Sequence, residues 1–130
     1  MPLLRTGRNQ LAGLATGASC ARYDSTGAII FVASATSPHD AATTWTWPSG
    51  NACASTMESG YPLRTDNIVQ HRGLYSTAQA NFQWESWGIH NATASGGSSG
   101  YLLNHAPAQV LGTKTSAQSW QITTSITFTT

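Results

Sequence analysis

The last twelve residues, 119–130, alternate strictly between two kinds of side chain. Trp120, Ile122, Ile126 and Phe128 share one parity, and hydroxyl or amide side chains fill the other. Successive side chains of a β-strand point to opposite faces of its sheet, so this alternation predicts a strand with one buried and one solvated face. A chain with such a segment is constrained to build a sheet around it.

Other segments add strands to this sheet. The apolar run at 28–33 predicts a strand buried on both faces, and residues 52–57 predict a short edge strand. Residues 67–75 predict another strand, but both of its parities mix apolar and polar side chains, so the pattern leaves its register open. Turn signals separate these segments, as in an antiparallel sandwich.

The aromatic segment before residue 90 changes parity. Phe82 and Trp84 share one parity, whereas Trp87 and Ile89 share the other, which predicts a β-bulge near residues 85–86. Gly88, beside this position, predicts a close approach of a backbone or an aromatic ring. With about six to eight strands in all, the expected fold class is all-β, an antiparallel β-sandwich.

One helix is expected, at residues 3–16, and the whole chain, residues 1–130, forms a single domain. The helix packs on the end of the sandwich or docks on a partner. Glycines weaken it by about 1 kcal/mol each relative to alanine. The expected apolar face consists of Leu4, Leu11, Ala12 and Ala15.

Charged residues make up only 8% of the chain, against roughly 25% in ordinary soluble domains, and the net charge is +1. So little charge gives weak protection against self-association, which favours a subunit of an assembly. The six Lys and Arg residues form no basic stripe, which argues against nucleic-acid binding. No apolar run is long enough for a membrane-spanning helix or a signal peptide, so synthesis in a cytoplasm without export is expected.

Residues that carry chemistry are few. Cys20 and Cys53 either form one disulfide or remain free, and the cytoplasmic setting favours free thiols. The histidines lack metal-ligand spacing, and neither a nucleophile elbow nor a phosphate-binding loop is present, so we expect no enzyme, metal or cofactor. Glu58 and Glu85 are the one carboxylate pair considered for glycoside hydrolysis, but a structural role for Glu85 is favoured.

Five tryptophans offer either core volume or a stacking surface for sugars. Alternation places most of the aromatic side chains inward. Trp45 and Trp47, beside a loop, are the better candidates for a partner or glycan contact, together with Leu4 and Leu11 of the helix. The expected structural core consists of Phe82, Trp84, Trp87, Ile89, Trp120, Ile122, Ile126 and Phe128.

Three segments resemble a family of small structural proteins of tailed bacteriophages. They are MESGYP at 57–62, ANFQWESWGIHNA at 80–92 and LGTKTSAQSW at 111–120. In that family a Phe-x-Trp-x-x-Trp-Gly-Val/Ile segment precedes an Asn-Ala turn, and a Leu-Gly-Thr-Lys-Thr segment leads into a terminal Thr-rich strand. The Trp-Gly-Ile pattern is also faintly similar to the N-terminal β domain of tail-collar fibre proteins. The region 20–50 departs from the family pattern.

The resemblance implies a virion component without a catalytic site, made in the host cytoplasm and bound to other virion proteins. The first hypothesis is a tail, baseplate, collar or fibre-attachment subunit. The alternatives are a capsid decoration protein and a carbohydrate-binding module for host recognition. Because phage assemblies are cyclic, a homo-oligomer such as a trimer or ring is expected.

Overall fold

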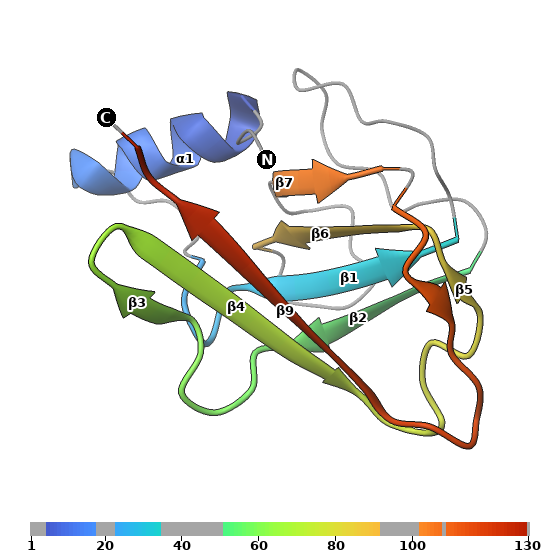
Figure 1. Cartoon of the computed structure of the whole chain (residues 1–130). Coiled ribbons are helices and arrows are strands. Elements are labelled where there is room, and N and C mark those ends of the chain that lie inside the picture. Colours follow the sequence, from blue (N-terminus) through green and yellow to red (C-terminus); the bar gives the residue numbers. More distant parts are fainter. Residues whose placement is uncertain (1–4, 18–22, 35–50, 92–101, 108, 130) are drawn as a thin grey trace.

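The computed structural model describes residues 5–17, 23–34, 51–91, 102–107 and 109–129 (Figure 1). These residues confirm an all-β fold with one short helix, and every strand pair is antiparallel. They form nine strands rather than six to eight, because two of the strands contain only two residues each. The elements are α1 (Arg5–Ala15), β1 (Ile29–Ala33), β2 (Ala52–Thr56), β3 (Leu63–Thr65), β4 (Ile68–Tyr75), β5 (Gln83–Trp84), β6 (Ser86–His90), β7 (Leu102–Ala106), β8 (Gly112–Thr113) and β9 (Trp120–Thr127).

Two larger sheets enclose the core. One has the strand order β2-β1-β6-β7 and the other β3-β4-β9, while β5 and β8 form a small separate pair. In Figure 1, β4 and β9 cross in front of β1, β2 and β6. Ile30 of β1 and Ile126 of β9 share one buried cluster. Tyr75 of β4 donates from its hydroxyl to the carbonyl oxygen of Ile30 at 2.8 Å, so the sheets pack as a sandwich.

The first two strands match the sequence expectations. All five residues of β1 are buried, as the apolar run at 28–33 predicts, because β1 lies between β2 and β6 inside the larger sheet. β2 falls within the expected edge strand at 52–57 and, among the described strands, pairs only with β1. The turn before β1 is held by Asp24, whose Oδ1 accepts hydrogen bonds from the backbone nitrogens of Thr26 and Gly27.

β9 has the predicted alternation, and it determines the register of β4. Thr124 and Ile126 are buried, whereas their sequence neighbours in the strand are exposed. Ile126 lies opposite Val69, and Thr124 lies opposite His71. Paired residues of antiparallel strands point to the same face, so Val69 and His71 point inward. The pattern of β4 alone could not decide this.

α1 lies within the expected range 3–16 and packs on β7. Its buried side consists of Gly7, Leu11 and Leu14, spaced four and three residues apart. The prediction that Ala12 and Ala15 face inward is wrong, because both are exposed. Gly7 has no side chain, so the helix backbone packs directly against β7 at this position. The buried face of α1 therefore includes Gly7 instead of Ala12 and Ala15.

Gly7→Ala tests this contact, because two effects predict opposite signs. Helix propensity alone would raise the free energy of unfolding by about 1 kcal/mol. A Cβ at Gly7, however, would lie 2.6 Å from the carbonyl oxygen of Leu103 and 2.7 Å from its Cα. We expect a net loss of about 1–3 kcal/mol in a guanidinium chloride titration. The exposed Ala12→Gly, which alters propensity alone, serves as the control. A more stable Gly7→Ala variant would refute the packing of α1.

The expected β-bulge at residues 85–86 is not found there. β5 ends at Trp84, and β6 begins at Ser86 with a different partner strand. Between them, the backbone nitrogen of Glu85 donates to the carbonyl oxygen of Ala33 at 2.9 Å. The chain passes here from one sheet to another. This passage changes the parity of its inward side chains without a bulge. The register irregularity of β6 lies between Ile89 and His90, opposite β7.

Three aromatic side chains fill the end of the core near β5. Trp84 is 2% exposed, and its ring contacts those of Tyr75 and Trp120 edge-on, with 5.0 Å between centroids in each pair. Its indole nitrogen donates to the carbonyl oxygen of Ala80 at 2.9 Å. Trp84 therefore buries a large apolar surface without leaving its N–H unsatisfied.

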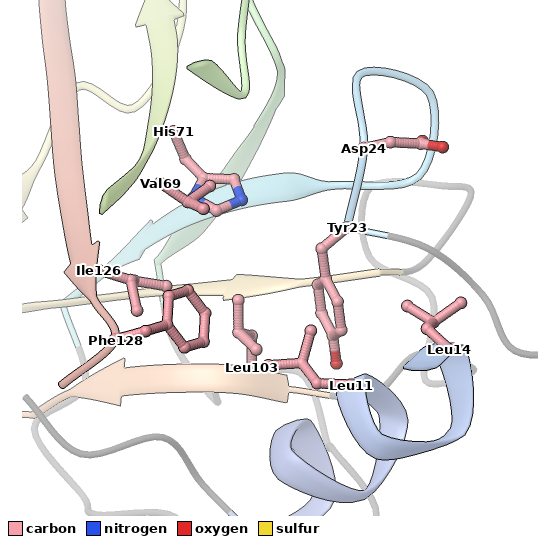
Figure 2. A pocket seen from close by; sticks show the side chains of 9 residues that line it. All are labelled: Leu11, Leu14, Tyr23, Asp24, Val69, His71, Leu103, Ile126 and Phe128. Atoms are coloured by element: carbon pink, nitrogen blue, oxygen red, sulfur yellow. The ribbon is translucent and has the colours of Figure 1, made fainter. Parts of the chain in front are cut away.

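Phe128 was expected in the core, and this is wrong, because its side chain is 42% exposed. β9 ends one residue earlier, at Thr127. The backbone nitrogen of Phe128 still donates to the carbonyl oxygen of Asn67 at 2.8 Å, and Asn67 Nδ2 donates back to the carbonyl oxygen of Phe128 at 2.9 Å. The parity of Phe128 is inward, but Phe128 lies beyond the end of β9, beside Ile126 (Figure 2).

Candidate functional site

A groove of about 340 Å³ follows the edge of β9 that faces away from β4. Four consecutive residues of β9, at 121–124, line it, and none of β4 does. Consecutive residues point to opposite faces of a sheet, so a surface that reaches all four runs along the strand edge. The remaining lining residues are Trp84, Trp87, Leu111 and Trp120.

The edge of β9 lacks the features that usually protect edge strands. Among the described strands, β9 pairs only with β4, so no described strand takes up the main-chain donors and acceptors of its other edge. Its eight residues, WQITTSIT, include no charged residue and no proline. Natural edge strands commonly use charges, prolines or bulges to prevent pairing with another chain. β9 is therefore suited to accept a strand.

The outer face of β4 and β9 carries a polar network. Arg72 Nε donates to Thr123 Oγ1 at 3.1 Å and lies 3.9 Å from Glu58 Oε2. Gln121 Nε2 donates to the same Glu58 oxygen at 2.8 Å. The Arg72 guanidinium also stacks on the ring of Tyr61, with 4.3 Å from its carbon to the ring centroid. These contacts hold β9 against β4 and involve none of the main-chain groups at the other edge of β9.

A second hollow, of about 310 Å³, lies between α1 and the inner face of β4 and β9 (Figure 2). It is bordered by aliphatic and aromatic side chains from the helix, from β4, β7 and β9, and from the turn before β1. We call it the α1 pocket. The side chains that line it are Leu11, Leu14, Tyr23, Asp24, Val69, His71, Leu103, Ile126 and Phe128.

His71 is the one imidazole among the described residues that line the α1 pocket. Its side chain is 1% exposed and points into the space between Ile126 and Tyr23 (Figure 2). Among the described residues, neither ring nitrogen has a hydrogen-bond partner of good geometry, although the Tyr23 backbone lies close enough to influence the ring. Burial lowers the pKa of His71 to about 4, against the weaker opposing effect of the Tyr23 backbone. The ring is therefore neutral at pH 7 and offers one donor and one acceptor nitrogen.

The carboxylates considered for glycoside hydrolysis belong to separate networks. Glu58 bonds to Gln121 and Arg72 on the outer sheet face. Glu85 lies between β5 and β6, where its backbone bonds to Ala33 and Gln109. Within the described ranges, no group of three or more His, Cys, Asp or Glu side chains is arranged to hold a metal ion. Cys53 is a half-buried free thiol whose pKa is raised by burial, and Cys20 lies outside the described residues.

The expected core residues gather around the two inner sheet faces. Trp84, Ile89 and Ile126 are buried, whereas Phe82, Trp87, Trp120 and Ile122 are half-buried and pack against the buried clusters. Among the expected contact residues, Leu11 is half-buried and lines the α1 pocket. Leu4, Trp45 and Trp47 lie outside the described residues. The structure thus connects three predicted core tryptophans, Trp84, Trp87 and Trp120, with the β9 groove.

Two residues with strong chemical character were not singled out in the sequence. The mixed pattern of β4 does not show which of its two faces is buried, so nothing in the sequence indicated that His71 is buried. Lys114 is 1% exposed, and its Nζ donates to Asn81 Oδ1 at 2.7 Å. Its backbone nitrogen bonds to the carbonyl oxygen of Phe82 at 3.1 Å, so Lys114 joins the turn before β5 to β8. Its place in the LGTKT segment was the available signal.

No family model, curated protein or solved structure matches this chain. The described part of the chain contains no helix that is long and apolar enough to cross a membrane.

Proposed function

We propose that this chain is a non-enzymatic structural subunit of a tailed-bacteriophage virion, acting in the tail as a baseplate, collar or fibre-attachment component. It joins its neighbours through protein–protein contacts, and copies of the chain form a ring or trimer. The observation that carries the proposal is the uncharged edge of β9 that no described strand covers, with the tryptophan-lined groove beside it. The resemblance of the segments at 80–92 and 111–120 supplies the phage setting.

The edge of β9 favours one kind of contact, the addition of a strand. Eight residues at about 3.4 Å each give an edge of about 27 Å. An added strand gains main-chain hydrogen bonds along this length, and the groove receives its alternate side chains. We assign the incoming strand to a neighbouring copy. A contact between two different surfaces of identical subunits repeats around an axis, and it closes into a ring when the rotation between neighbours divides a full turn.

Two large apolar side chains beside the groove support burial on assembly. Val110 is 67% exposed and Leu111 is 45% exposed, and both precede β8. Leu111 also lines the groove, so an incoming strand would cover it. Covering apolar surface releases roughly 25 cal/mol per Å², which adds to the main-chain bonds.

A charge placed on this edge should weaken assembly. In Gln121→Lys, an ammonium lines the groove while Glu58 remains available as a partner for the new side chain. A neighbouring strand on this edge would take the new ammonium and the Glu58 carboxylate out of water together, and this desolvation costs more than the pair regains, so we expect the assembly concentration to rise at least tenfold. The measurement is the mass distribution by sedimentation velocity over a concentration series.

Thr65→Lys provides the matched control for this experiment. Thr65 is exposed on β3, which is the opposite edge strand of the same sheet. It should leave assembly unchanged. Equal effects of the two variants, or a wild-type chain that stays monomeric at every concentration, would contradict assembly through β9. A stable monomer that binds only to assembled shells would favour the capsid decoration role instead.

A carbohydrate-binding role is the second candidate, and the groove favours it to a lesser degree. Trp87 and Trp120 line the groove beside the polar Gln121 and Thr123, a combination that suits a sugar ring. A glycan array without any signal, or a signal that persists in Trp87→Ala, would remove this alternative.

The virion role itself is tested by quantitative mass spectrometry of purified particles. A structural subunit should be present at several copies per particle and should remain after washing with high salt. Its absence from particles of an infection in which the chain is expressed would contradict the proposal.

A further inference from the structure

We infer that the α1 pocket is a binding site for a small neutral molecule with an apolar body and a single hydroxyl group, which hydrogen-bonds to His71. The inference rests on the pocket alone and does not depend on the proposed virion role. Two features carry it: a largely apolar hollow of defined size, and one buried polar ring that faces this hollow without a partner.

The size of the pocket limits the ligand. An engineered cavity of about 150 Å³ holds one benzene molecule. The α1 pocket, at about 310 Å³, is about twice as large and lies at the lower limit of ligand sites in proteins. A ligand of roughly ten non-hydrogen atoms fits this volume. Aliphatic side chains from the helix and from the strands surround its body, as Leu11, Val69 and Leu103 illustrate (Figure 2).

The polar character of the site comes from His71. Buried polar groups in native proteins nearly always have hydrogen-bond partners, and each exception calls for an explanation. His71 is 1% exposed, and neither of its ring nitrogens has a hydrogen-bond partner of good geometry among the described residues. A hydroxyl group can donate to the unprotonated nitrogen or accept from the N–H, whichever tautomer is present. A bound alcohol or phenol therefore satisfies a group that the protein itself leaves unsatisfied.

The described lining of the pocket favours a neutral ligand over an ionic one. No Lys or Arg is among the described residues that line it, so none of these residues balances a carboxylate or a phosphate. Asp24 is the only acidic residue among those described in the lining, and it points away from the centre (Figure 2). The Oδ1 of Asp24 already accepts hydrogen bonds from the Thr26 hydroxyl and from the backbone of Gly27, so it is not directed at a cation in the pocket. A neutral head group is the remaining choice.

The test compares two probes that differ by one hydroxyl, para-propylphenol and propylbenzene. Each is titrated into the full chain while the His71 ring resonances are followed by NMR. We expect saturable binding of both probes, with the phenol bound about 3- to 10-fold more tightly, because one hydrogen bond contributes about that factor. The His71 resonances should shift with the phenol and follow its binding curve.

Two variants separate the hydrogen bond from the cavity. His71→Leu keeps an apolar lining and should abolish the preference for the phenol. Leu14→Trp, at a half-buried position of the helix, fills the pocket and should block both probes. The inference is overturned if neither probe saturates, if propylbenzene binds as tightly as the phenol, or if His71→Leu retains the preference. The oligomeric state of the chain affects none of these outcomes.

Discussion

Acidification from pH 7 to pH 4 is expected to lower the free energy of unfolding by several kcal/mol, through two buried histidines. Burial lowers the pKa of His71 and of His90 to about 4 in the folded chain. An unfolded histidine titrates near pH 6.5. Each shift corresponds to a loss of about 3 kcal/mol in the free energy of unfolding at a pH below both the folded and the unfolded pKa. The losses from the two histidines together approach the total stability of a small domain.

The direction of this effect follows from the two pKa values of each histidine. Above about pH 6.5 both the folded and the unfolded chain hold neutral rings, and the full stability is present. As the pH falls below 6.5, the unfolded chain takes up protons that the folded chain still excludes, which favours unfolding. The loss is complete once the pH is below the folded value of about 4. Stability therefore decreases between pH 6.5 and 4.

Different neighbours surround the two rings. Tyr23 and Asp24 line the α1 pocket with His71, whereas the ring of His90 lies 5.9 Å from that of Phe31, centroid to centroid. Guanidinium chloride titrations at pH 7.5, 6 and 5 measure the effect. His71→Leu should remove about half of the pH dependence. An unfolding free energy that stays constant from pH 7.5 to 5 would show that these rings are not buried in neutral form.

Gly88→Ala is expected to destabilise the domain by about 3 kcal/mol or more. A Cβ on Gly88 would lie 2.5 Å from Phe31 Cε1 and 2.7 Å from the backbone carbonyl oxygen of Asn104. Gly88 is paired with Phe31 of β1 on one side and with His105 of β7 on the other, so the backbone cannot move away. Overpacking of a well-packed core typically costs 1–3 kcal/mol, and a clash against backbone lies at the upper end.

A matched glycine separates the clash from general effects of alanine. Gly60 has a φ of +85° and no atom within 4 Å of a Cβ, so Gly60→Ala should cost only the left-handed strain of about 1 kcal/mol. The difference between the two unfolding free energies measures the steric contribution at Gly88. If Gly88→Ala and Gly60→Ala were equally stable, the close approach of the Phe31 ring would be refuted.

The sequence predicted features that depend on local pattern. The alternation at 119–130 predicted β9, the apolar run at 28–33 predicted a buried strand, and the small residue at Gly88 predicted the approach of a ring. Each of these patterns is strong because it is set by the periodicity of a strand or by the absence of a side chain. The same alternation predicted Phe128 in the core. This prediction is wrong, because parity indicates the sheet face to which a side chain points but not how deeply that side chain is buried.

The remaining features depend on contacts between distant segments. The inward parity of β4 is set by its pairing with β9, and only this pairing reveals that His71 is buried. The buried face of α1 is set by the contact of Gly7 with β7, which helical periodicity could not indicate. The change of sheet at Glu85 resembled a bulge in the sequence, because both produce the same change of parity.

Immunogold labelling of purified virions with an antibody against this chain tests the tail-subunit proposal most directly. We predict gold at the tail or its attached fibres, with the same pattern on every particle. Gold distributed over the head would contradict a tail role and identify a decoration protein. Particles that contain no detectable chain by mass spectrometry and bind no gold would contradict any structural role in the virion.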